Sequence, residues 1–253
     1  MSKRAADSRD NVTNWYHVPM QVRALISDLD GTLLDTLSDM ADAVNIALDR
    51  LGLPQHELSA YRRFVGDGRR MMALRALPQE HRNDATLEPF LAYIAQEYDQ
   101  RWMARSVPYA GIPEMLDELA RRGIRLAVLS NKPQAYVTPM VDTILRRWTF
   151  EHAVGESPDI PRKPDPAGAL RIIDLMGLQP GQCLYMGDSG VDMQVAAAAG
   201  MYGVGVLWGF RDEDELRASG ARALARHPDD VIALLDAQQT ASGVTPPGAE
   251  SPR

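Results

Sequence analysis

Short apolar runs recur along the chain, separated by longer segments in which apolar residues have helical spacing. The runs cover residues 22–28, 125–131, 183–188 and 202–207. Strands that alternate with helices predict a parallel sheet, because each parallel connection must cross over the sheet. The expected fold is α/β, with a doubly wound, Rossmann-like parallel sheet as its core. Ligands bind such sheets at the carboxyl ends of the strands, so polar residues at those ends are candidates for a site.

Two helices next to these runs have clear ends in the sequence. One is expected from Ile112 to Arg122, with Gly123 as its stop. The other is expected over the alanine run 196–199 and ends at Gly200. Glycine commonly follows the last helical residue, because it adopts the left-handed backbone conformation that closes a helix. The small alanine side chains favour close packing of the second helix on the sheet.

An unusually long segment, residues 37–107, separates the first two runs and contains no convincing strand. Apolar residues at helical spacing predict a helix at about residues 41–51, and further helices are expected around 71–77 and 87–105. A compact helical cap over the carboxyl edge of the sheet is the simplest use of such an insertion.

This organisation divides the chain into a core, a cap and two terminal segments. Residues 21–36 and 108–236 are expected to form the core. Residues 1–20 have little hydrophobic periodicity, and residues 237–253 are rich in Pro, Gly, Ser and Thr. Such segments bury little apolar surface, so we expect a flexible N-terminal extension and a flexible C-terminal tail.

Composition and charge exclude several classes of partner. The chain has 253 residues, 45% of them hydrophobic, and 27 basic against 34 acidic residues give a net charge of −7. This balance argues against general affinity for nucleic acid or for an anionic membrane surface. No stretch approaches the ~20 apolar residues that span a bilayer, and residues 1–14 lack a signal-peptide pattern. We expect a cytoplasmic protein, and the oligomeric state stays open.

Cysteine and histidine offer no second kind of chemistry. Cys183 is the only cysteine, so no intrachain disulfide can form, and its apolar surroundings favour a small core residue over a nucleophile. The five histidines have no metal-ligand spacing. No zinc site is indicated.

Two aspartates, Asp28 and Asp30, end the first apolar run and precede Gly31 and Thr32. Carboxylates at the end of a buried strand mark the point where the sheet opens to solvent. At this junction they are candidates for a nucleophile and an acid/base. The segment resembles motif I of the haloacid dehalogenase-like phosphatases. This resemblance implies hydrolysis of phosphate monoesters through an aspartyl phosphate on Asp28, with Asp30 as the acid/base.

A second acidic segment, Gly187-Asp188-Ser189-Gly190-Val191-Asp192, follows the third apolar run and resembles motif IV of the same family. Carboxylates that face a phosphate need a cation between them, and oxygen ligands favour Mg²⁺. The resemblance implies that Asp188 binds Mg²⁺ together with the Asp28 carboxylate and the Asp30 backbone carbonyl. Asp192 is expected to support the ion, directly or through a neighbour. The alternative is that Asp188 and Asp192 only start a turn and cap a helix.

Two further segments supply groups for a phosphate. Ser130 and Asn131, in Ser-Asn-Lys-Pro, end the second apolar run and resemble motif II, which implies that they bind phosphate oxygens. Lys163, in Arg-Lys-Pro-Asp-Pro, resembles the lysine of motif III, which neutralises the phosphoryl group and the nucleophile. Taken alone, Ser130 would be a helix cap and Lys163 a surface charge.

The presence of a second acid and the absence of a cap lysine disfavour some of the reactions known in this family. Dehalogenases of this superfamily lack the second acid, so Asp30 disfavours dehalogenation. Phosphonate-cleaving relatives use a lysine in the cap, and residues 37–107 contain none. A sugar phosphomutase remains open, because it differs mainly in whether water or a sugar hydroxyl meets the aspartyl phosphate. A phosphate-binding regulator without turnover is a further alternative, which the intact acids argue against.

The substrate expectation rests on the cap. Residues 64–69, Phe-Val-Gly-Asp-Gly-Arg, resemble the cap signature of phosphoglycolate phosphatases, as does Pro-Tyr-Ala-Gly at 108–111. This resemblance implies a small phosphorylated metabolite, with 2-phosphoglycolate as the first candidate and sugar phosphates, nucleotides and pyrophosphate as alternatives. Arg69 would meet a substrate carboxylate, or would be an ordinary exposed residue at a helix start.

Overall fold

The core is a six-stranded parallel sheet with the strand order β5-β4-β1-β6-β7-β8. The computed structural model describes residues 21–241. Strand β1 lies between β4 and β6, where Ile26 is paired with Ala127 on one side and Tyr185 on the other. The strands of the sheet are β1 (Ala24–Ser27), β4 (Arg125–Pro133), β5 (Phe150–Glu156), β6 (Cys183–Gly187), β7 (Tyr202–Val206) and β8 (Ala223–Ala225).

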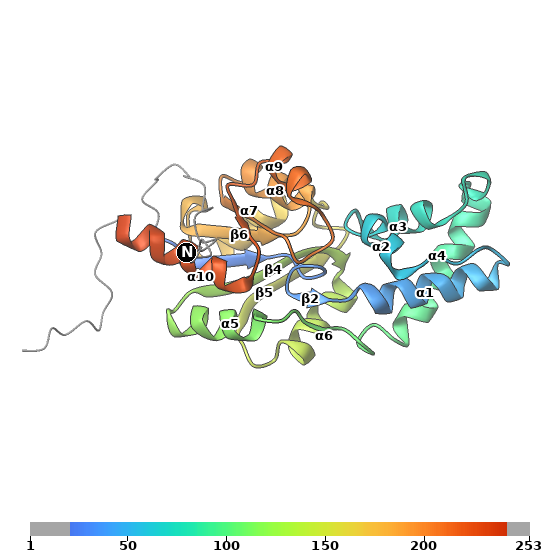
Figure 1. Cartoon of the computed structure of the whole chain (residues 1–253), viewed down its shortest axis with the longest axis horizontal. Helices are drawn as coiled ribbons and strands as arrows, with labels where there is room; N and C mark the ends of the chain where they lie inside the picture. Colours follow the sequence, from blue (N-terminus) through green and yellow to red (C-terminus); the bar gives the residue numbers. More distant parts are fainter. Residues whose placement is uncertain (1–20, 242–253) are drawn as a thin grey trace, which may run out of the picture.

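Helices cover both faces of the sheet, as the doubly wound fold requires (Figure 1). Apolar side chains of α5, α6 and α10 pack against one face. Side chains of α7 and α8 pack against the other face, and α9 packs beside α8. The helices are α5 (Ile112–Arg121), α6 (Gln134–Ile144), α7 (Ala167–Leu175), α8 (Gly190–Ala198), α9 (Glu213–Ala218) and α10 (Pro228–Ala241), with a short 3-10 helix η2 (Pro180–Gln182). The expected fold class is confirmed.

The four predicted strands all form, but the sheet also contains β5 and β8, which the sequence did not indicate. Both are edge strands, and an edge strand does not need an apolar run. In β5 only Gly155 is buried, and β8 is three residues long. The predicted helix ends agree closely with the structure: α5 is followed by Gly123 and α8 by Gly200, both at positive φ.

Most of the segment between β1 and β4 forms a helical cap at one end of the sheet (Figure 1), and only its last helix, α5, packs on the sheet. The cap helices are α1 (Leu37–Arg50), α2 (Leu58–Phe64), α3 (Gly68–Ala76) and α4 (Asp84–Asp99), with a 3-10 helix η1 (Gln79–His81). They enclose a hydrophobic core of their own, centred on Val44, Tyr61 and Phe90. Where the segment leaves and rejoins the core, β2 (Leu34–Asp35) pairs antiparallel with β3 (Val107–Pro108).

Two details of the cap differ from the prediction. Helix α2 was not expected, because its seven residues include two arginines and only Tyr61 is buried. The last cap helix ends at Asp99 rather than near residue 105, and turns follow it. The domain boundaries at residues 36/37 and 107/108 stay predictions.

The predicted terminal segments fall largely outside the described residues. This holds for the extension at 1–20 and for residues 242–253 of the tail. Residues 237–241, which the sequence placed in the tail, belong to α10. Between residues 21 and 241, no helix combines the length and the apolar character that a membrane crossing needs.

Candidate active site

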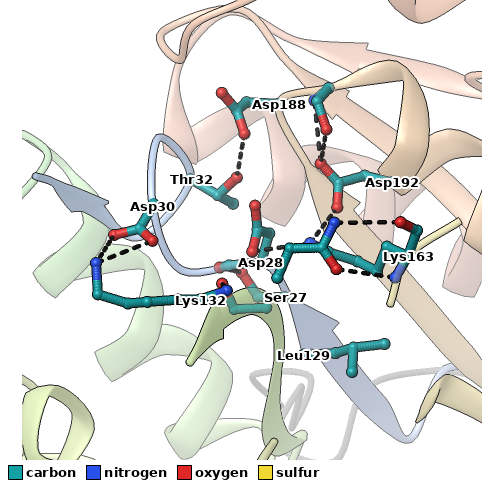
Figure 2. Close-up of polar contacts among 12 residues, drawn as sticks. Ser27, Asp28, Asp30, Thr32, Leu129, Lys132, Lys163, Asp188 and Asp192 are labelled. Atoms are coloured by element: carbon teal, nitrogen blue, oxygen red, sulfur yellow. Dashed lines mark hydrogen bonds and ion pairs between the residues drawn. The ribbon is translucent and has the colours of Figure 1, made fainter. Parts of the chain in front are cut away.

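The loops that follow β1, β4 and β6 meet at the carboxyl edge of the sheet, and the loop after β5 joins them (Figure 2). Because these strands are neighbours and parallel, residues far apart in the sequence are brought together there. Asp28 follows β1, Ser130 and Asn131 lie at the end of β4, Lys163 lies between β5 and α7, and Asp188 and Asp192 follow β6.

Three aspartates form a compact, buried cluster. Asp28, Asp188 and Asp192 each place one carboxylate oxygen within 4.8 Å of the others. Burial raises the pKa of Asp28 to about 6 and that of Asp188 to about 8. For Asp188, the neighbouring carboxylates add to this effect. A cation in the cluster would relieve both the desolvation and the repulsion.

Lys163 is buried against this cluster. Its Nζ lies 2.9 Å from Asp28 Oδ1 and 2.7 Å from Asp192 Oδ1. The amide side chain of Asn131 holds the lysine backbone, since Asn131 Oδ1 accepts a hydrogen bond from Lys163 N at 2.8 Å and Asn131 Nδ2 donates one to Lys163 O at 3.2 Å. Lys163 is thus a charged partner of the cluster and not a surface lysine.

Asp188 is held by two neighbouring loops, those after β1 and β7. Thr32 Oγ1 donates a hydrogen bond to Asp188 Oδ1 at 3.2 Å, and Phe210 N donates one to Oδ2 at 2.7 Å. Gly31, at φ +83°, leaves room for this carboxylate, because a Cβ there would stand 2.4 Å from Asp188 Oδ2. The short motif around Asp30 therefore requires glycine for steric as well as conformational reasons.

Asp192 also has the structural role that was considered for it. It forms a capping box at the start of α8, where its Oδ2 accepts hydrogen bonds from Ser189 N at 3.1 Å and Ser189 Oγ at 2.5 Å. Its Oδ1 accepts a hydrogen bond from Lys163. The same carboxylate thus caps a helix and belongs to the acidic cluster.

Asp30 turns away from the three aspartates, toward Lys132 (Figure 2). Lys132 Nζ lies 2.9 Å from Asp30 Oδ1 and 3.2 Å from Oδ2, and Thr36 Oγ1 donates a hydrogen bond to Oδ1 at 2.7 Å. Sequence reasoning missed Lys132. The sequence did contain a signal for it, because Lys132 directly follows Ser130 and Asn131, the two residues of this segment that were expected to bind phosphate.

A cavity lies between this edge and the cap. Core residues that line it include Asp28, Asp30, Ser130 and Asn131, whereas the cap side is mostly apolar. The main cap residues are Met40, Val65, Arg69, Met72, Ile94 and Tyr98. Lys163, Asp188 and Asp192 are buried next to the cavity-lining Asp28.

Arg69 lies where it could face the cavity, and its contact with a substrate carboxylate stays a prediction. It is an exposed residue in the first turn of α3, and it lines the cavity. The neighbouring Gly68, at φ +79°, lines the cavity and also approaches the core closely, because a Cβ there would stand 1.2 Å from Arg162 Nη2. Arg162 donates a hydrogen bond to Asp67 O at 2.6 Å, so the cap loop is joined to the residue that precedes Lys163.

Comparison with known proteins agrees with this geometry. The family model for haloacid dehalogenase-like hydrolases matches residues 25–206. A phosphoglycolate phosphatase from Pseudomonas putida is 34% identical over 228 residues, which cover 88% of this chain and 82% of that protein. One from Pectobacterium atrosepticum is 31% identical over 220 residues, covering 85% of this chain and 92% of that protein.

A solved structure resembles the whole described fold. The crystal structure of a predicted phosphoglycolate phosphatase from Haemophilus somnus superposes with a TM-score of 0.76 at 28% identity, covering 85% of this chain and 98% of that one. The sheet order, the inserted cap and the acidic edge of the sheet agree with the family match, and this chain belongs to the haloacid dehalogenase-like hydrolases.

Proposed function

We propose that the protein is a Mg²⁺-dependent phosphomonoester hydrolase that works through an aspartyl phosphate on Asp28. The observation that carries the proposal is the contact of Lys163 with both Asp28 and Asp192 inside a buried cluster of three aspartates. The first candidate substrate is 2-phosphoglycolate, since the relatives described above bear the name phosphoglycolate phosphatase.

The donor set fits a magnesium ion. Asp28 Oδ1 is buried and, among the described residues, has an ion pair with Lys163 but no well-directed hydrogen bond. Hard carboxylate oxygens are what Mg²⁺ binds, so Asp28, Asp188 and the Asp30 carbonyl would hold the ion. Asp192 already caps α8 through Oδ2 and pairs with the Lys163 ammonium through Oδ1, and we assign it a supporting role through Lys163 and Ser189. Bound Mg²⁺ would neutralise the carboxylates and the phosphate.

Each residue of the site has a separate role in the proposed reaction. Asp28 attacks phosphorus, and the bond from phosphorus to the leaving oxygen breaks. Lys163, Ser130 and Asn131 supply positive charge and hydrogen-bond donors to the phosphoryl oxygens. Asp30 would enter the reaction protonated on one oxygen, give that proton to the leaving alkoxide and afterwards take one from the water that attacks the aspartyl phosphate, so that inorganic phosphate is released.

The remaining parts of the proposal concern location and partners. We propose a cytoplasmic enzyme with a small phosphorylated metabolite as its substrate and neither nucleic acid nor membrane as a partner. The net charge of −7 supports the absence of polyanionic partners.

The test is Mg²⁺-dependent release of inorganic phosphate from a panel that contains 2-phosphoglycolate, sugar phosphates, nucleotides and pyrophosphate. Asp28→Asn serves as the inactive control. A clear preference for 2-phosphoglycolate supports both the mechanism and the substrate, whereas preference for another monoester keeps only the mechanism. Transfer of phosphate between sugar positions with a bisphosphate activator would replace the proposal with a mutase, and binding without turnover would replace it with a regulator.

A further inference from the structure

Lys132 is a buried charge that the mechanism above does not use. It lies near the end of β4, and its side chain is 4% exposed. Burying an ammonium group is costly unless it is paired, so its partners indicate its role. Those partners are Asp30 and Tyr98, one from the core and one from cap helix α4.

The three donors of the ammonium group face three acceptors. Lys132 Nζ lies 2.9 and 3.2 Å from the two oxygens of Asp30 and 2.6 Å from the hydroxyl oxygen of Tyr98. It also stands 4.8 Å from the centre of the Tyr98 ring. An ammonium group has three N–H bonds, so no donor is left to bind a phosphate. Lys132 therefore differs from Lys163, which contacts the proposed nucleophile directly.

The contacts also restrict where the Asp30 carboxylate points. Lys132 and Thr36 hold it away from the three aspartates, and Figure 2 shows Asp30 turned toward Lys132. Through Tyr98, Lys132 also contacts cap helix α4. A leaving alcohol would occupy the side toward the cap, because the phosphoryl group would lie over the proposed nucleophile, Asp28. Misplacement of a reacting group by about 1 Å can reduce a rate about 100-fold.

We propose that Lys132 is a positioning residue that holds Asp30 against the leaving oxygen, and that the Tyr98 hydroxyl helps to hold Lys132 from the cap. The inference rests on the proposed function, in which Asp30 is the acid. Tyr98 makes the arrangement depend on the cap, since α4 must lie as observed for the hydroxyl to reach Lys132.

The experiment compares two leaving groups in Lys132→Met. The alkoxide that leaves 2-phosphoglycolate needs a proton, whereas p-nitrophenolate leaves p-nitrophenyl phosphate without one. Because kcat/KM reports the steps up to departure of the alcohol, we expect it to fall about 30- to 100-fold for 2-phosphoglycolate and less than about threefold for p-nitrophenyl phosphate. If the panel favours another alkyl monoester, that ester takes the place of 2-phosphoglycolate.

Asp30→Asn separates failure of this inference from failure of the proposed function. Like Lys132→Met, it is expected to lower kcat/KM mainly for 2-phosphoglycolate, and by a larger factor. If Asp30→Asn lowers kcat/KM equally for both substrates, the acid role of Asp30 is wrong. Asp30→Asn could instead lower kcat/KM mainly for 2-phosphoglycolate. If Lys132→Met then lowers kcat/KM equally for both substrates, or for neither of them, the positioning role of Lys132 is wrong.

Tyr98→Phe provides a second, milder variant that keeps the ring and its packing. Loss of the hydroxyl contact is expected to lower kcat/KM for 2-phosphoglycolate about threefold, with no change for p-nitrophenyl phosphate. This comparison also serves if Lys132→Met does not fold. Equal effects of Tyr98→Phe on kcat/KM for the two substrates, or no effect on either, would overturn the role assigned to Tyr98. Lys132→Gln, with a neutral side chain of similar length, would then repeat the test of Lys132.

Discussion

The core side and the cap side of the cavity are built from different kinds of residue. On the core side, Asp28, Asp188 and Lys163 are ionisable and buried, and contacts from several loops hold them. Among the cavity-lining residues that the described cap contributes, Arg69 alone is charged. The core side thus carries the groups proposed to act on the phosphate ester bond, whereas the cap side is a mostly apolar wall that would contact the leaving alcohol.

The largest effect should come from the core side. Asp28→Asn keeps the size of the side chain but removes the nucleophile, so phosphate release should fall at least about 10³-fold. The melting temperature of the metal-free variant should not decrease, because a buried and repelled carboxylate has been neutralised. Phosphate release and thermal denaturation check the two halves of this prediction, and activity close to that of the natural protein would contradict the nucleophilic role.

A smaller effect should come from the loop that joins the two sides. Gly68→Ala forces a residue with a Cβ into φ +79°, which should cost ~1–2 kcal/mol. The Cβ also displaces the Arg162 guanidinium from its hydrogen bond to Asp67 O, which should add about 1 kcal/mol. Gly52→Ala is the matched control, because Gly52 has φ +66° with nothing within 4 Å of the added Cβ. Denaturant unfolding of both variants measures the difference, and equal losses would show that the contact with Arg162 does not matter.

Arg69 tests whether the cap side selects the substrate. If it meets a substrate carboxylate, Arg69→Ala should raise KM for 2-phosphoglycolate about tenfold or more, as expected for a charge-assisted hydrogen bond, and leave kcat nearly unchanged. Arg70→Ala is the matched control, because Arg70 instead forms exposed ion pairs with Asp84 and Glu88. Equal behaviour of the two variants would make Arg69 an ordinary surface residue.

The smallest effect concerns pH and the metal. In the metal-free protein, the pKa values of Asp28 and Asp188 lie near 6 and 8, above their ordinary value. Their contribution to stability is therefore complete below about pH 4 and is lost as pH rises through 6 and 8. Mg²⁺ binds the ionised form, so it should raise the melting temperature more at pH 8 than at pH 6. A shift that does not depend on pH would contradict binding at these carboxylates.

Sequence patterns predicted the core side much better than the cap side. Asp28 and Asp188 follow buried, apolar strands, and strand ends in a parallel sheet must meet. Lys132 was missed because periodicity does not reveal which partners a buried lysine will find across 34 and 102 residues of chain. The edge strand β5 and helix α2 were missed because they are partly exposed and lack a regular apolar pattern.

The β2–β3 pair has a consequence for how this chain can be altered. Leu34 is paired with Pro108 and Asp35 with Val107, so the cap enters and leaves the core at one point. The whole cap is thus connected to the core in the way that a hairpin loop is connected to its two strands. Cap segments that keep Tyr98, exchanged between relatives at this ladder, should therefore give chimeras that retain the hydrolytic centre while the range of accepted alcohols changes.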